Sequence, residues 1–191
     1  MPKKLLLLMI TVFIVVTLAG CGEEKKEEVN HENMNMESNS NAHEGMDMNH
    51  SGSGELPKGL NVSENPTFEV GSQAIIQANH MEGMNGAEAT IVGAFDTTAY
   101  IISYTPTNGG ERVTDHKWVI QEEIKDAGEE TFETGSEVII EADHMEGMDG
   151  AIAEIDSSEK TVVYMIDYTS TTGGEKVTNH KWVTESELSK N

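Results

Sequence analysis

The feature that most constrains this chain of 191 residues is an internal repeat with a period of 64 residues. Residues 68–124 align with residues 132–188 without a gap, and 32 of the 57 aligned positions are identical. A tandem duplication of this kind makes each copy one structural unit. Each copy is near the lower size limit for independent folding, so we expect the two copies to pack on each other.

The hydrophobic pattern within each copy has a period of two residues. Val138, Ile140 and Ala142 fall on one face of a strand, and the segments 161–168 and 176–183 continue the strand pattern. No segment has a sustained period of 3.6 residues. The pattern predicts an all-β fold of two tandem small β-barrels. The order of strands and glycine-rich loops resembles SH3-like barrels of the KOW type, an analogy of fold that carries no function.

The first twenty residues have the composition of an export signal. Lys3 and Lys4 precede an apolar run over residues 5–18, which ends in the sequence "LAGC". This pattern predicts a lipoprotein signal peptide over residues 1–20, cleaved before a lipidated Cys21. The alternatives are an ordinary signal peptide with an incidental cysteine or an uncleaved anchor, but the run is short for a spanning helix. We therefore expect a lipid-anchored protein on the outer face of the cell membrane.

The charge and composition of the remaining chain suggest its organisation and exclude some partners. Residues 21–66 are polar and nearly free of branched or aromatic side chains, which predicts a disordered tether. β repeats over residues 67–124 and 131–188 follow it. The net charge of −22 becomes −24 once Lys3 and Lys4 are removed. Such acidity argues against nucleic acid as a partner and is compatible with cations, although solubility alone would also explain it.

Methionine and histidine occur together three times in polar surroundings, twice as "HMEGM" in glycine-containing loops. The loop residues are His80, Met81, Met84, His144, Met145 and Met148, and those of the tether are His31, Met34, Met36, His43, Met46, Met48 and His50. Thioether sulfur suits Cu(I) and imidazole suits copper in both oxidation states, whereas zinc sites rarely use methionine. The pattern therefore predicts copper sites, with methionines that fill gaps in the core as the alternative.

Two further histidines, His116 and His180, each stand two residues before a tryptophan in a predicted strand. They would add copper ligands if that strand lies beside the loop, and otherwise they are polar residues of the sheet. No triad order, phosphate loop or HExxH motif is present in the sequence, so we expect no enzymatic activity.

The whole pattern also resembles a known family. The lipobox, the Met/His-rich tether and two copies of "HMxGMxGA…Y…YT…GGE.VT.HKWV" resemble the YdhK-type lipoproteins of Gram-positive bacteria and the related copper-resistance lipoprotein CopL. The resemblance implies a surface lipoprotein and, for the CopL branch, copper binding and copper tolerance. The expected function is non-enzymatic sequestration of copper, Cu(I) favoured, with a copper-exporting transporter as a candidate partner. The alternative is a surface module whose tandem barrels bind a peptide, a protein or a wall polymer.

Overall fold

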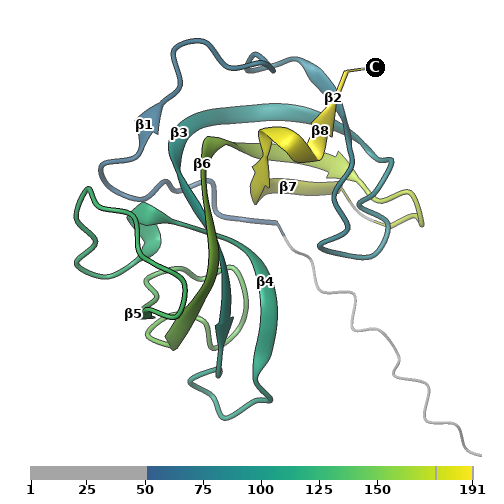
Figure 1. Ribbon diagram of the computed structural model, residues 1–191. Coiled ribbons are helices and arrows are strands. Elements are labelled where there is room, and N and C mark those ends of the chain that lie inside the picture. Colours follow the sequence, from purple (N-terminus) through teal and green to yellow (C-terminus); the bar gives the residue numbers. More distant parts are fainter. Residues whose placement is uncertain (1–50, 175, 191) are drawn as a thin grey trace, which may run out of the picture. The chain divides into compact units, whose positions relative to one another are not determined.

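Figure 1 shows the computed structural model of the protein, which describes residues 51–174 and 176–190. These residues lie in one compact unit, Gly45–Asn191. The expected signal peptide, the lipidated Cys21 and most of the expected tether lie outside them. The predicted tether ligands His31, Met34, Met36, His43, Met46, Met48 and His50 are likewise outside the described residues. Within the described part, no helix has the length and apolar character needed to cross a membrane.

The secondary structure confirms the predicted all-β class. Its strands are β1 (Asn61–Val62), β2 (Gln73–Ile76), β3 (Glu88–Tyr104), β4 (Val113–Ile120), β5 (Glu137–Ile139), β6 (Ile152–Thr169), β7 (Lys176–Thr184) and β8 (Leu188–Ser189). Two 3-10 turns, η1 (Gln121–Glu123) and η2 (Glu185–Glu187), follow β4 and β7. All eight strands belong to one antiparallel sheet, and no α-helix occurs in the described ranges.

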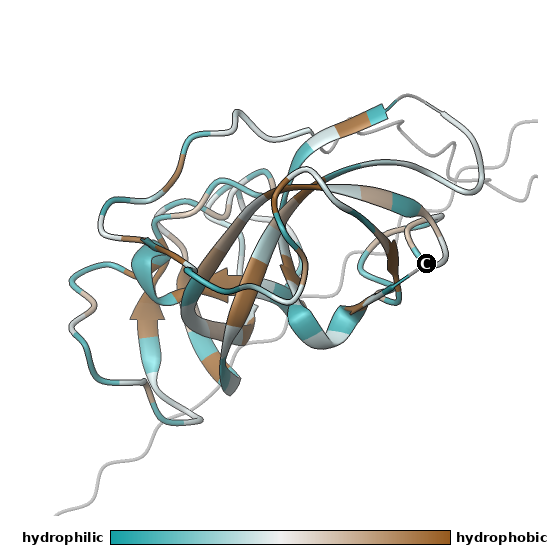
Figure 2. Cartoon of the chain, turned by 90° about the horizontal axis from the view of Figure 1, so that it is seen from above, coloured by the Kyte–Doolittle hydropathy of each residue, from teal (hydrophilic) through white to brown (hydrophobic). Residues whose placement is uncertain are grey.

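The alternation read from the sequence decides which side chains are buried. Val138, Ile140 and Ala142 are buried, and the residues between them are exposed. In the middle of the sheet both faces are covered, so that Val163, Tyr164, Met165 and Ile166 of β6 are all buried. Figure 2 shows the result along the chain, with hydrophobic residues gathered on the central strands and hydrophilic residues on the connecting loops.

Two long strands, one from each repeat, run side by side through the sheet. β3 has 17 residues and β6 has 18, and they pair antiparallel from Ala89 opposite Tyr168 to Tyr104 opposite Ala153. The register shifts between Ile91 and Gly93 and again farther along the strand, irregularities of the kind that bend a strand. Because the pairing spans both strands, each end of the ribbon contains the first half of one repeat and the second half of the other.

The two ends of this ribbon form two lobes (Figure 1). Lobe 1 contains β2, β7, β8 and the adjoining halves of β3 and β6, whereas lobe 2 contains β4, β5 and the other halves. The core of lobe 1 packs Ile76 and Ile91 of repeat 1 against Ile166 of repeat 2. The core of lobe 2 packs Tyr100 of repeat 1 against Ile155 of repeat 2. Each lobe thus draws its core from both repeats.

This exchange differs from the expected pair of barrels, one for each repeat. The pattern over residues 161–168 predicts one short strand. The structure makes these residues part of β6, which is continuous over 18 residues, as β3 is over 17, and an extended segment of that length is too long for a single small lobe. Each core therefore contains side chains from both repeats, and neither repeat forms a barrel by itself.

The described part of the expected tether is ordered on the sheet. β1 pairs with β3, and the backbone N–H of Ser63 donates to the carbonyl of Ala94 at 3.0 Å. Farther back, the N–H of Gly52 donates to the carbonyl of Thr178 at 2.8 Å. Residues 51–66 therefore belong to the folded unit, in contrast to the disorder expected for them.

Candidate functional site

Each "HMEGM" loop consists of two consecutive turns. In repeat 2, the N–H of Met148 donates to the carbonyl of Met145 at 3.1 Å, and the N–H of Ala151 donates to the carbonyl of Met148 at 3.0 Å. Gly147 and Gly150 have φ angles of +77° and +76°, which L side chains rarely adopt. The loop of repeat 1 has the same turns. These glycines therefore allow the turns that decide which side chains of the loop point inward.

The second methionine of each loop is a core residue. Met84 and Met148 have no exposed surface and belong to the cores of lobe 1 and lobe 2. The three side chains of each loop therefore do not converge on one point as predicted. For these two methionines the structure matches the packing alternative.

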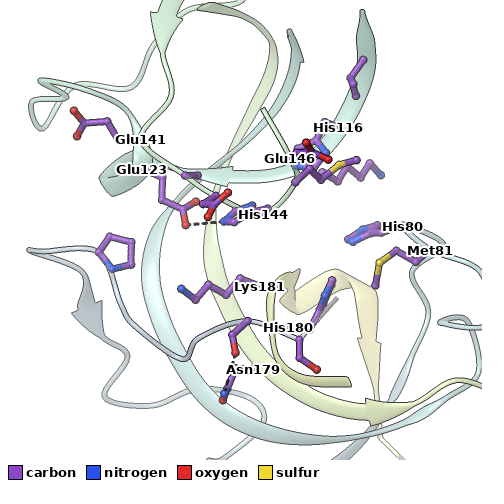
Figure 3. Close-up of a pocket in the computed structure, with 18 of the residues that line it drawn as sticks. His80, Met81, His116, Glu123, Glu141, His144, Glu146, Asn179, His180 and Lys181 are labelled. Atoms are coloured by element: carbon purple, nitrogen blue, oxygen red, sulfur yellow. Dashed lines mark hydrogen bonds and ion pairs between the residues drawn. The ribbon is translucent and has the colours of Figure 1, made fainter. Parts of the chain in front are cut away.

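The first methionine of each loop is more accessible and lines a cleft. Met81 is partly buried against the core of lobe 1, while Met145 is 37% exposed. The Sδ atom of Met145 accepts a long hydrogen bond of 3.9 Å from the hydroxyl of Tyr104. Both methionines line the cleft that also holds the histidines, and Figure 3 shows Met81 beside His80.

Each loop histidine is held by a glutamate from the other repeat. His80 Nε2 lies 2.8 Å from Glu187 Oε1, and His144 Nε2 lies 2.8 Å from Glu123 Oε1 (the latter contact is dashed in Figure 3). The glutamates are largely buried, at 13% and 4% side-chain exposure. Sequence reasoning missed both, although a glutamate at the same place in each repeat was a visible signal.

Two tryptophans complete these pairs from the opposite lobe. Trp118, on β4, donates its indole N–H to Glu187 Oε2 at 2.8 Å, and Trp182, on β7, donates to Glu123 Oε2 at 3.0 Å. Both tryptophans belong to a buried cluster with Phe95 between the two cores. Burial alone would raise the pKa of Glu187, but its hydrogen bonds with His80, Thr184 and Trp118 and the charge of His80 hold that pKa below its usual value.

The two strand histidines reach the same cleft, each against a tyrosine ring. His116 packs edge-on to Tyr104 with ring centroids 5.9 Å apart, and His180 packs on Tyr168 at 5.8 Å. His116 also lies near His144, with ring centroids at 6.3 Å. Burial lowers the pKa of His116 to about 4, helped by the positive charges of His144 and His80 and opposed by Glu123.

Three of these imidazoles keep a buried ring nitrogen that meets no hydrogen-bond partner. The atoms are His80 Nδ1, His116 Nε2 and His144 Nδ1. A buried polar atom without a partner is costly, so such atoms point to a ligand. Among the described residues, no three His, Cys, Asp or Glu side chains already surround one point closely enough to hold a metal ion. The donors are therefore gathered in the cleft without forming a closed coordination site.

The cleft has a volume of about 2140 Å³ and carries many carboxylates, among them Glu141 and Glu146. Two of its lysines are engaged with its walls. Lys117 lies 3.9 Å from Glu187 and over the ring of Trp118, and Lys181 lies over the ring of Trp182. The cleft thus offers imidazole nitrogen, thioether sulfur and negative charge together, a set of donors suited to a cation.

These features define a class, an all-β protein of two interlocked repeats with a histidine-lined cleft. Comparison with known proteins gives the family. The family described as "Protein of unknown function (DUF1541)" matches residues 70–121 and 134–185, one match for each repeat. The chain belongs to this DUF1541 family, which is also the family of YdhK.

The relatives include both sequences and solved structures from Bacillus subtilis. The "Uncharacterized protein YdhK" of strain 168 is 63% identical over 177 residues, which cover 92% of this chain and 84% of that protein. The crystal structure of ydhK, a DUF1541 family protein, is 68% identical with a TM-score of 0.73, covering 76% of this chain and 99% of the crystallised one. A solution NMR structure of the ydhK C-terminal domain is 71% identical with a TM-score of 0.62, covering 65% of this chain and 94% of the other.

Proposed function

We propose that this protein binds and sequesters copper, Cu(I) in preference, in the cleft between the lobes. The ligands are imidazoles of His80, His116, His144 and His180 and the thioethers of Met81 and Met145. Imidazole and thioether together form a donor set that suits Cu(I) and that zinc rarely uses. The resemblance to the copper-resistance lipoprotein CopL supports the same role in copper tolerance.

One observation carries this proposal, namely the arrangement of the His80 and His144 rings. Metal-binding histidines usually bond one ring nitrogen to a carboxylate and use the other for the metal. Here Nε2 of each ring meets Glu187 or Glu123 at 2.8 Å, and Nδ1 is left without a partner. The carboxylate fixes the ring orientation and keeps Nδ1 as the free donor.

The proposal includes a place for the protein in the cell. Lipid on Cys21 would hold it at the outer face of the membrane, where thiolate ligands are prone to oxidation and thioethers do not depend on a free thiol. The tether would add flexible binding capacity through its own methionines and histidines. A copper-exporting transporter is the partner that such a position suits.

The loops themselves provide a matched test, because each has one methionine in the cleft and one in the core. Residues 51–191 leave out all the histidines and methionines of the tether, and a relative has been crystallised over a comparable length. Its Cu(I) affinity is measured by competition with a chromophoric chelator under anaerobic conditions. Met81→Leu with Met145→Leu is the test variant, and Met84→Leu with Met148→Leu is its control.

We expect the test variant to lose Cu(I) affinity and the control variant to keep it, with both remaining folded, because leucine preserves volume but has no sulfur. Equal affinity of the test variant and the parent would overturn the role of the thioethers. If the parent unit does not compete for Cu(I) at all, the cleft is not a copper site. The preferred hypothesis would then be a surface module that binds a peptide, a protein or a wall polymer.

A further inference from the structure

The two halves of the cleft are related by the 64-residue repeat, and the proposed ligands divide accordingly. His116 of one repeat corresponds to His180 of the other, and Met145 corresponds to Met81. Perfect symmetry would give two equal sites. The structure departs from that symmetry in three places, all of which favour the half that contains His116.

The first departure is a cover over one half only. Residues 51–57, called the strap here, lie along β7, where the N–H of Thr178 donates to Ser51 Oγ at 3.0 Å and Asn179 Nδ2 donates to the carbonyl of Gly52 at 3.4 Å. The Nζ of Lys181 donates to the carbonyl of Glu55. His180, which lies between these contact residues, is only 8% exposed.

The corresponding stretch of repeat 1 is more exposed. Asp115 stands where repeat 2 has Asn179, so the amide donor that bonds the strap carbonyl in repeat 2 has no counterpart there. Asp115 and Lys117 are exposed, and His116 between them is half-buried. This half of the cleft is open to an incoming ion.

The second departure concerns which rings face each other. His144 lies beside His116 at 6.3 Å with an interplanar angle of 35°. His80 instead lies edge-on to Trp118 at 6.5 Å. The half that contains His116 thus brings two imidazole rings side by side.

The third departure concerns the thioether. Tyr104 contacts both Met145 Sδ, at 3.9 Å, and the ring of His116, at 5.9 Å, so that one side chain adjoins both prospective ligands. Met81, by contrast, packs against the core of lobe 1.

From these observations we infer that His116, His144 and Met145 form the first-filled copper site of the cleft, and that the strap makes the His180 half fill later and more weakly. The inference rests on the proposed function and adds to it the order and the composition of the sites. Two imidazoles and one thioether form a ligand set that suits Cu(I). The buried ring nitrogens His116 Nε2 and His144 Nδ1 are the donors already without partners.

The test compares equivalent substitutions in the two halves of the unit 51–191, titrated with Cu(I) alone against a chelator. His116→Leu should lower the affinity for the first equivalent by about tenfold or more, since losing even an outer partner of a metal ligand costs about that much. His180→Leu should instead lower the affinity for the second equivalent. Met145→Leu, at an exposed position, should act like His116→Leu and serves if the histidine variant does not fold.

A third variant addresses the strap. A Cβ atom on Gly52 would lie 2.5 Å from the backbone oxygen of Asn179, so Gly52→Val should displace the strap. We expect it to tighten the second equivalent and to leave the first unchanged. Equal losses from His116→Leu and His180→Leu, or a second equivalent unmoved by Gly52→Val, would overturn the inference while leaving copper binding intact. Failure of the parent to bind Cu(I) would overturn the proposed function.

Discussion

His116 makes the stability of the folded unit depend on acid in a way that can be calculated. Its pKa falls from 6.5 to about 4 on folding, because burial and the neighbouring His144 and His80 disfavour the charged ring. Between these two values the unfolded chain binds more protons than the folded protein, so stability decreases as the pH falls. From pH 7 to pH 5 the loss attributable to this ring is about 2 kcal/mol.

The matched variant is His116→Leu, which stays neutral at every pH. Urea unfolding of the parent and the variant at pH 7, 6 and 5 should show the variant gaining about 2 kcal/mol on the parent over that range. In an NMR titration of the parent, the ring resonances of His116 should shift with a midpoint near pH 4, below the midpoint of an ordinary histidine. Parallel stability curves for the two proteins, or a ring that titrates near 6.5, would refute the reasoning.

Three further outcomes follow from the sequence and the structure. Cys21→Ala should move the protein from the membrane fraction to the medium, and unchanged fractionation would contradict the lipid anchor. Met84→Ala or Met148→Ala should cost about 2–5 kcal/mol of unfolding free energy because each side chain is fully buried, whereas leucine should cost less than about 1.5 kcal/mol. Trp182→Phe removes the indole donor to buried Glu123 and should cost at least about 1–3 kcal/mol; denaturant midpoints at parental level would contradict that contact.

The all-β class could be read from the sequence, and so could the buried face of the first strand of repeat 2, where apolar and polar residues alternate; the runs of buried residues in β3 and β6 follow no alternation. Val138, Ile140 and Ala142 are buried as their spacing predicts. The exchange of strands between repeats could not be read in this way. Identical repeats give the same local pattern whether a strand pairs within its own repeat or with the other one, and only the continuity of β3 and β6 decides between these arrangements.

The candidate site was predictable in part. His80 and His144 line a cleft with Met81 and Met145, and the strand histidines His116 and His180 line it too.

The positions of the remaining groups depend on tertiary pairing. Met84 and Met148 lie in the same loops as Met81 and Met145, but the turn geometry directs them into the cores. Glu123 and Glu187 are far from their histidine partners in the sequence, so no local spacing could indicate those contacts.

Copper K-edge X-ray absorption on the Cu(I)-loaded unit 51–191 tests the central claim most directly, because it identifies the atoms bound to the metal. The account predicts both imidazole nitrogen and thioether sulfur around copper, with the sulfur contribution lost from Met81→Leu with Met145→Leu and retained in Met84→Leu with Met148→Leu. A parent spectrum with oxygen neighbours alone, or a sulfur contribution that survives the first pair of substitutions, would contradict it.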